Sequence, residues 1–273
     1  MFEAIILGII QGLTEFIPIS SSAHIRLAGE VFPNAIDPGA MFTAITQIGT
    51  ELAVLIYFRK DIARIISAWV SSLTDKSART QDSKMGWLII IGSLPIVIIG
   101  YLAQDFIETD LRSLWIIATM MVVFGLILGA ADKYASKTKE LSQLTVKHGV
   151  LYGLAQSLAL IPGVSRSGAT IAMGRALGYS REAALRYSFL LALPAVFGSG
   201  LYQLKSALSE DQVAVYSLGE TFVATAIAFV VGYLVISWLL KFVTTKSFAP
   251  FIIYRVILGS VLLVLLAFGV LQP

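Results

Sequence analysis

The sequence predicts an all-α membrane protein with six transmembrane helices and two re-entrant helical hairpins, arranged as an inverted-topology repeat. Of its 273 residues, 57% are hydrophobic and 14% are charged, whereas soluble domains carry about 25% charged residues. Six segments are apolar enough to cross a bilayer, and two further apolar segments break at a proline. There is no cysteine, which excludes disulfides, thiolate metal sites and cysteine nucleophiles.

The membrane spans follow from length and apolarity, because a helix needs about 20 mostly apolar residues to cross a bilayer. The six predicted spans are 40–58, 86–104, 113–131, 185–205, 218–241 and 251–271. Two other apolar stretches break at Pro18 and Pro162, and each continues as a short helical piece. This pattern predicts helix–loop–helix hairpins that enter the membrane and return. The start of the chain lacks the cationic region of a signal peptide, so we expect it to stay in the fold.

Loop charges predict the orientation. The cationic segments are 59–84, 132–147, 175–186 and 241–247. The acidic loops are 105–112, with Asp105 and Glu108, and 206–217, with Glu210 and Asp211. The positive-inside rule places the cationic segments in the cytoplasm and the acidic loops outside. Both termini then lie outside, hairpin 1–39 enters from outside, and hairpin 148–184 enters from the cytoplasm. The polar tips of the hairpins are expected to meet near the midplane.

The chain divides into two similar halves within a single integral membrane domain, 1–273. Residues 1–131 and 148–273 each contain one broken hairpin followed by three spans. The breaks are alike in sequence, QGLTEFIPISSS (11–22) and QSLALIPGVSRS (156–167). Because three is an odd number of spans, the second half is predicted to be inverted relative to the first, as in many transporters.

The second break, GVSRSGAT (163–170), has the composition of a phosphate cradle. Ser165, Arg166 and Ser167 precede a short predicted helix, whose N-terminal N–H groups attract anions. A guanidinium adds bidentate bonds that suit phosphate. The alternative is a capped re-entrant turn in which Arg166 pairs with Glu15.

The first break offers a carboxylate, hydroxyls and an imidazole. Gln11 and Glu15 share a helix face, and Glu15 can hold a divalent cation or act as a base. The serines at 20–22 are candidate nucleophiles or helix caps, and His24, with an ordinary pKa of about 6.5, can shuttle a proton. The alternative is capping serines with His24 bonded to a carbonyl. Glu51, within an apolar span, is expected to bind a proton or cation or to pair with another helix.

These motifs, in this order, resemble the undecaprenyl-diphosphate phosphatase family, also called the bacitracin-resistance family. The resemblance covers most of the chain and rests on QGLTEFIPISSSAH (11–24), ITQIGTELAV (45–54), PGVSRSGATI (162–171), YSFLLALP (187–194) and PFIIYR (250–255). It implies a multi-pass enzyme of the bacterial inner (plasma) membrane, with its active site open to the extracytoplasmic side. Its reaction would remove the terminal phosphate of a C55 polyprenyl diphosphate, yielding the monophosphate carrier of cell-wall synthesis, and would confer bacitracin resistance.

The resemblance also implies roles for residues of the two breaks. The implied catalytic residues are Glu15, Ser21, His24 and Arg166. The implied substrate-binding residues are Gln11, Ser20, Ser165, Ser167, Gly168 and Thr170. Glu15 would hold a divalent cation, Mg²⁺ or Ca²⁺. Many members have glutamate where Gln11 stands and glycine where Ala23 stands, so Glu15 is the sole carboxylate at the first break.

Three routes to the bond with phosphorus remain open: attack by Ser21 with His24 as proton acceptor, direct attack by His24, and attack by water that Glu15 positions. A transporter or lipid flippase is the competing class, since fold alone does not decide function, and a membrane scaffold is a third. The predicted partners are a polyprenyl diphosphate and membrane lipid, without nucleic acid. The oligomeric state is open, with a homodimer as one candidate.

Overall fold

The structure, a computed structural model of the chain, describes residues 1–31, 38–103, 106–107, 110–136, 138–208 and 215–272. These residues form helices, apart from turns and one isolated bridge between Lys139 and Tyr179. The long helices are α3 (Gly39–Tyr57), α5 (Gln81–Leu102), α7 (Leu114–Tyr134), α10 (Arg181–Leu208), α11 (Leu218–Thr245) and α12 (Ala249–Ala267). The all-helical prediction is therefore confirmed.

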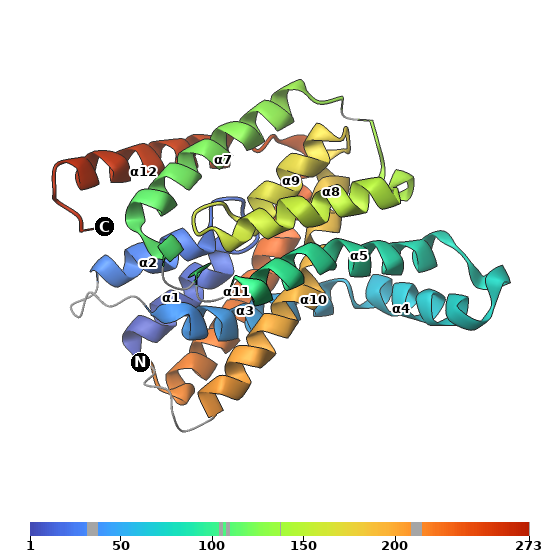
Figure 1. Cartoon of the computed structure of the whole chain (residues 1–273), viewed down its shortest axis with the longest axis horizontal. Coiled ribbons are helices and arrows are strands. Elements are labelled where there is room, and N and C mark those ends of the chain that lie inside the picture. The colour runs from blue at the N-terminus through green and yellow to red at the C-terminus, as the bar shows by residue number, and fades with distance from the viewer. Residues whose placement is uncertain (32–37, 104–105, 108–109, 137, 209–214, 273) are drawn as a thin grey trace.

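Both predicted hairpins are present as pairs of short helices. The first pair is α1 (Phe2–Thr14) with α2 (Ser21–Val31), and the second is α8 (Val146–Ser157) with α9 (Arg166–Ala176). None of the four is longer than 13 residues, well below the 20 or so needed to cross a bilayer. In Figure 1 both pairs lie between α7 and α12 on one side and α10 and α11 on the other.

The two breaks share one unusual backbone feature. Ser20 and Ser165 have φ angles of 76° and 69°, and in the described part of the chain they alone, apart from glycines, have positive φ. Each also caps the following helix, since Ser20 Oγ accepts from Ala23 N at 3.4 Å and Ser165 Oγ accepts from Gly168 N at 3.1 Å. This correspondence is compatible with the internal repeat, whose inverted orientation stays a prediction.

The spans agree with the sequence except at one place. Among the described residues, five helices are long and apolar enough to cross a membrane. A sixth span is reached if α3 and the next helix, bent by 80°, are counted together. That next helix, α4 (Arg59–Thr74), lies in the segment predicted as a loop. Its charges lowered the mean hydropathy, although Ile62, Ile65 and Trp69 recur at helical spacing. The loop prediction for 59–74 was therefore wrong.

The orientation stays a prediction. Four of the acidic residues on which it rests, Asp105, Glu108, Glu210 and Asp211, lie outside the described residues.

Small residues let the helices pack closely around the two hairpins. A Cβ on Gly49 of α3 would lie 2.1 Å from the carbonyl oxygen of Thr225 in α11. A Cβ on Gly153 of α8 would lie 2.3 Å from the carbonyl oxygen of Gly92 in α5. Close backbone approach at small residues is the usual mode of helix association in membranes. Figure 1 shows α7 and α12 side by side at one edge, with α10, α11 and α3 on the opposite side.

A buried ionic cluster fastens the ends of α7, α9 and α10. Asp132 accepts from Arg175 Nε at 2.9 Å, and from Arg181 Nε and Nη2 at 2.8 and 2.9 Å. The N–H of Phe248, just before α12, also donates to it at 3.4 Å. The cluster ties the second hairpin to the long helices.

Removing this carboxylate is expected to be costly. Asp132→Ala leaves the fully buried Arg175 without its ion pair, and breaking a buried pair costs about 3–5 kcal/mol. Thermal or denaturant unfolding of the purified protein in detergent measures the change. Asp61→Ala is the matched control, since the ion pair of Asp61 with Arg64 is more exposed and is worth about 0–1 kcal/mol. Equal losses in the two variants would contradict a structural role for the cluster.

Candidate active site

Glu15 is the point at which the two hairpins meet. It directly follows α1, and its side chain is almost fully buried. Its Oε2 accepts from Gln11 Nε2 at 2.8 Å and from Ser21 Oγ at 2.6 Å, and its Oε1 accepts from Arg166 Nη2 at 2.6 Å. The predicted meeting of the hairpin tips is therefore confirmed, although their depth in a bilayer stays a prediction.

A second carboxylate, which is outside the predicted site, reaches the same arginine. Glu51 of α3 is fully buried, and its Oε1 accepts from Arg166 Nη2 at 2.6 Å. The pairing of Arg166 with Glu15, weighed from the sequence as the structural alternative, is thus present. Glu51, expected to bind a proton or cation or to pair with another helix, pairs with Arg166 of α9. Three buried atoms here have no hydrogen-bond partner within the described chain: Gln11 Oε1, Glu51 Oε2 and Arg166 Nη1.

The remaining predicted residues of the second break surround this centre. Ser167 Oγ donates to the carbonyl of Glu15 at 3.3 Å and lies 3.2 Å from Ser165 Oγ. Thr170 is buried, donates to the carbonyl of Arg166 at 2.8 Å and lies 2.5 Å from Ser188 Oγ. The Ser167 bond holds the first turn of α9 against the first break, and the Thr170 contact joins α9 to α10. Gly168 presents its N–H to Ser165.

Arg255 of α12 joins the two breaks and was missed in the sequence analysis. It is fully buried, and its guanidinium donates to the carbonyls of Pro18, Gly163 and Val164 at 3.2, 2.8 and 3.0 Å. One cation thus satisfies backbone acceptors from both polar tips. The available signal was an arginine inside an apolar span, where ionisable groups are costly and commonly functional.

His24 has hydrogen-bond partners other than Ser21. Its Nδ1 lies 2.7 Å from the carbonyl of Ser20, and its Nε2 lies 2.7 Å from the hydroxyl of Tyr254. A carbonyl only accepts, so Nδ1 carries a hydrogen, and in the neutral ring Nε2 accepts from Tyr254. The structure therefore brings Ser21 to Glu15 and His24 to Tyr254, and Tyr254 is a second residue that sequence reasoning missed.

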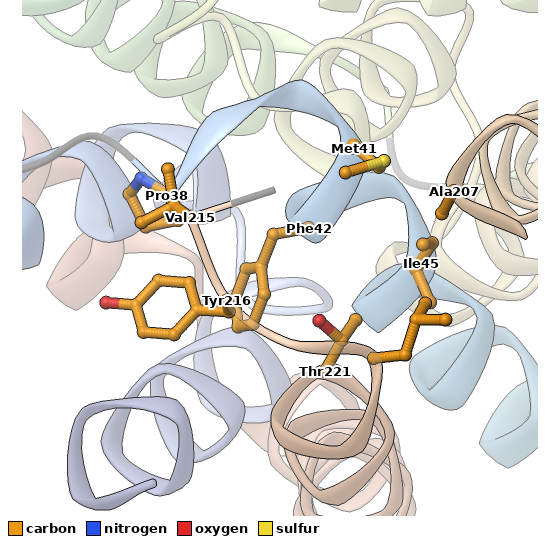
Figure 2. Close-up of a pocket in the computed structure, with 9 residues that line it drawn as sticks. Pro38, Met41, Phe42, Ile45, Ala207, Val215, Tyr216 and Thr221 are labelled. Atoms are coloured by element: carbon orange, nitrogen blue, oxygen red, sulfur yellow. The ribbon is translucent and has the colours of Figure 1, made fainter. Parts of the chain in front are cut away.

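The space at the centre is small. A cavity of about 10 Å³ is lined by Glu15, Glu51, Arg166, Ser167, Ser188 and three apolar residues, which is close to the least volume that holds one water molecule. A diphosphate therefore needs these side chains to separate. Another cavity, of about 30 Å³, lies between the ends of α3, α10 and α11 (Figure 2). None of its nine lining residues is charged, so it offers no catalytic groups.

The donor set at the centre suits a hard divalent cation. In the described chain no three histidine, cysteine or acidic side chains gather as a ready-made metal site. Glu15, Glu51 and the amide oxygen of Gln11 are nevertheless close oxygen donors, and two of their oxygens have no hydrogen-bond partner. Mg²⁺ typically takes one or two carboxylates together with substrate phosphates, so these residues fit the implied cation.

Apolar helices that enclose a buried arginine and a hydroxyl–carboxylate pair define a multi-pass membrane protein with an internal polar site. An arginine near a hydroxyl and a carboxylate has the chemistry that phosphoryl transfer needs. The sequence matches the profile of the bacitracin resistance protein BacA family over residues 4–261. The chain therefore belongs to this family, as its motifs predicted.

Named relatives match along the whole chain. It is 61% identical to an undecaprenyl-diphosphatase of Pseudarthrobacter chlorophenolicus over 273 residues, which cover 99% of both chains. It is 61% identical to an undecaprenyl-diphosphatase of Micrococcus luteus over 272 residues, which cover 99% of this chain and 98% of the relative. It is 56% identical to undecaprenyl-diphosphatase 2 of Streptomyces coelicolor over 285 residues, which cover 100% of this chain and 97% of the relative.

Proposed function

We propose that this chain hydrolyses the terminal phosphate of undecaprenyl diphosphate to give undecaprenyl phosphate. This reaction recycles the lipid carrier of cell-wall synthesis and confers bacitracin resistance. The observation that carries the proposal is the buried contact of Arg166 and Ser21 with opposite oxygens of Glu15. The names of the relatives support the same activity.

Arg166 and the start of α9 are proposed to bind the diphosphate. Arg166 Nη1 has no partner in the described chain, and a guanidinium forms charge-assisted, bidentate bonds with phosphate. The positive end of the helix dipole adds to this attraction, because Arg166 is the first residue of α9. The same contacts stabilise the charge on the transferring group.

Ser21 is proposed as the nucleophile, with Glu15 rather than His24 as its proton acceptor. Ser21 Oγ already donates to Glu15 Oε2 at 2.6 Å. Oγ would attack the terminal phosphorus, its proton would pass to Glu15, and the bond to the bridging oxygen would break, releasing undecaprenyl phosphate. Glu15 would return the proton to the departing undecaprenyl phosphate. It would then take a proton from the water that attacks the phosphoserine, so that inorganic phosphate leaves and Ser21 Oγ regains a proton. Direct attack by His24 would first require Nε2 to leave Tyr254.

A divalent cation, Mg²⁺ or Ca²⁺, is proposed to be held by Glu15 and to neutralise phosphate charge during transfer. Gln11, Ser20, Ser165, Ser167, Gly168 and Thr170 are proposed to line or support the substrate site. The apolar helices make the chain a multi-pass membrane protein. We further propose the bacterial inner membrane, an active site open to the extracytoplasmic side and both termini outside. The homodimer stays a prediction.

The decisive test is phosphate release from undecaprenyl diphosphate by the purified full chain in detergent. We expect release with Mg²⁺ or Ca²⁺, its loss with a chelator, and its return when the ion is restored. Hydrolysis without a membrane gradient separates an enzyme from a transporter or flippase. A folded preparation that releases no phosphate with either ion would overturn the proposal.

A further inference from the structure

We propose that Glu51 is the second carboxylate of the cation site, and that Arg166 competes with the cation for its position until the substrate binds. The inference rests on the proposed phosphatase function and adds to it an exchange. A divalent cation takes the position between Glu15 and Glu51, and the guanidinium moves to the phosphate. Glu51 lies on α3, outside both hairpins.

The charges of the cluster are unbalanced. Arg166 supplies one positive charge, whereas Glu15 and Glu51 supply two negative charges when both are ionised, and all three side chains are buried or nearly so. Gln11 and Ser21, which also contact Glu15, are neutral donors. An unpaired buried charge is strongly unfavourable. The cluster therefore has the electrostatics of a site that gains stability from a further positive charge.

The geometry allows one ion to replace one nitrogen. Arg166 Nη2 lies 2.6 Å from Oε1 of Glu15 and 2.6 Å from Oε1 of Glu51. Ca²⁺ binds oxygen at about 2.3–2.6 Å and Mg²⁺ at about 2.0–2.1 Å. A Ca²⁺ ion at the position of Nη2 would thus be at bonding distance from both carboxylates, and Mg²⁺ would need only a small contraction.

The unpartnered atoms around this point suit the exchanged state. Glu51 Oε2 and Gln11 Oε1 are buried acceptors without a partner in the described chain, and a cation prefers such oxygens as ligands. Arg166 Nη1 is a buried donor without a partner, and a phosphate oxygen would satisfy it. Each of these atoms is thus left unsatisfied while Arg166 lies between the carboxylates, and each would gain a partner after the exchange.

The experiment measures Mn²⁺ as a spectroscopic probe, with free ion quantified by electron paramagnetic resonance in titrations of the purified full chain in detergent. Glu51→Gln should weaken Mn²⁺ binding at least about tenfold, since loss of outer-shell partners alone costs 10–100-fold. Glu182→Gln is the matched control, because it removes a half-exposed carboxylate of α10. Gel filtration and thermal unfolding verify that each variant is folded.

Two further variants distinguish a cation ligand from a structural partner of Arg166. Gln11→Glu combined with Glu51→Gln should restore Mn²⁺ binding to within about threefold of wild type, because it moves the second carboxylate to the other side of Glu15. Arg166→Gln should strengthen Mn²⁺ binding, because it removes the competing guanidinium. If Glu51 only anchors Arg166, the Arg166→Gln variant would instead bind Mn²⁺ no better than wild type.

Folded Glu51→Gln protein that binds Mn²⁺ within twofold of wild type would overturn the inference, as would wild type without saturable binding. Phosphate release is measured on the same wild-type preparation. If wild type releases phosphate while Glu51→Gln binds Mn²⁺ normally, the inference fails and the proposed function stands. If wild type releases none, the proposed function fails whatever the Mn²⁺ titration gives.

Discussion

Arg166→Ala is expected to lower the rate of phosphate release from undecaprenyl diphosphate at least about 100-fold. Removing one donor to transition-state charge commonly costs 10²–10³ in rate, and arginines that act on transferring phosphoryl groups supply 10³–10⁵. Arg166 is the cation placed beside Ser21 through their shared contact with Glu15. Steady-state kinetics of phosphate release by the purified protein give both kcat and kcat/KM.

Two controls separate chemistry from folding. Arg166→Ala leaves Glu15 and Glu51 without their shared cation, so the protein is expected to lose stability. Arg166→Lys keeps the positive charge and loses the planar fork that binds phosphate bidentately, so it should remain folded and still be strongly impaired. Arg64→Ala removes an exposed arginine of α4 and should leave turnover near normal. Near-normal turnover in folded Arg166→Ala would refute the phosphate-binding role.

The helical framework was largely predictable because membrane spans depend on a property of each segment alone. Sustained apolarity located α5, α7, α10, α11 and α12, and proline followed by serine located both breaks. The helix α4 was missed because its mean hydropathy is lowered by Arg59, Lys60, Asp61 and Arg64. Its helical pattern lies in the spacing of its apolar residues, which an average over a window does not detect.

The site was only partly predictable, since it is closed by contacts between residues far apart in the chain. The breaks contain Glu15, Ser21 and Arg166, so their motifs identified these residues. Arg255 and Tyr254 act from α12, more than 200 positions from the carbonyl of Pro18 and the imidazole of His24. An arginine in an apolar span was a usable signal, whereas a tyrosine there was not distinguishable from a packing residue.

The pairing of Ser21 with His24 illustrates a limit of local spacing. The two residues are three apart in α2, and such residues share a helix face, so a hydroxyl–imidazole pair was a reasonable expectation. The structure instead directs Ser21 to Glu15 across the turn and His24 to Tyr254 on another helix. Spacing along one helix fixes which face a side chain occupies, and the neighbouring elements decide what it contacts there.

Ser21→Ala is expected to reduce phosphate release at least about 1,000-fold, because it removes the atom proposed to attack phosphorus; single losses in a nucleophile–base unit reach 10⁴–10⁶. Glu15→Gln should be similarly impaired, since Ser21 Oγ donates to its carboxylate at 2.6 Å. The double variant should be little worse than either single one, because residues that act as a unit are not additive. Ser22→Ala removes the neighbouring hydroxyl, which lies 3.2 Å from Ser20 Oγ, and should stay active.

Trapping the intermediate identifies the attacking atom. Acid quench of the enzyme with substrate labelled in its terminal phosphate should yield phosphoserine at Ser21, because the hydroxyl is already hydrogen-bonded to a base. The label should disappear in Ser21→Ala and persist in His24→Gln. A phosphohistidine at His24 would instead require the imidazole to break its contact with Tyr254 and would exclude Ser21. Turnover without any covalent adduct would favour water positioned by Glu15.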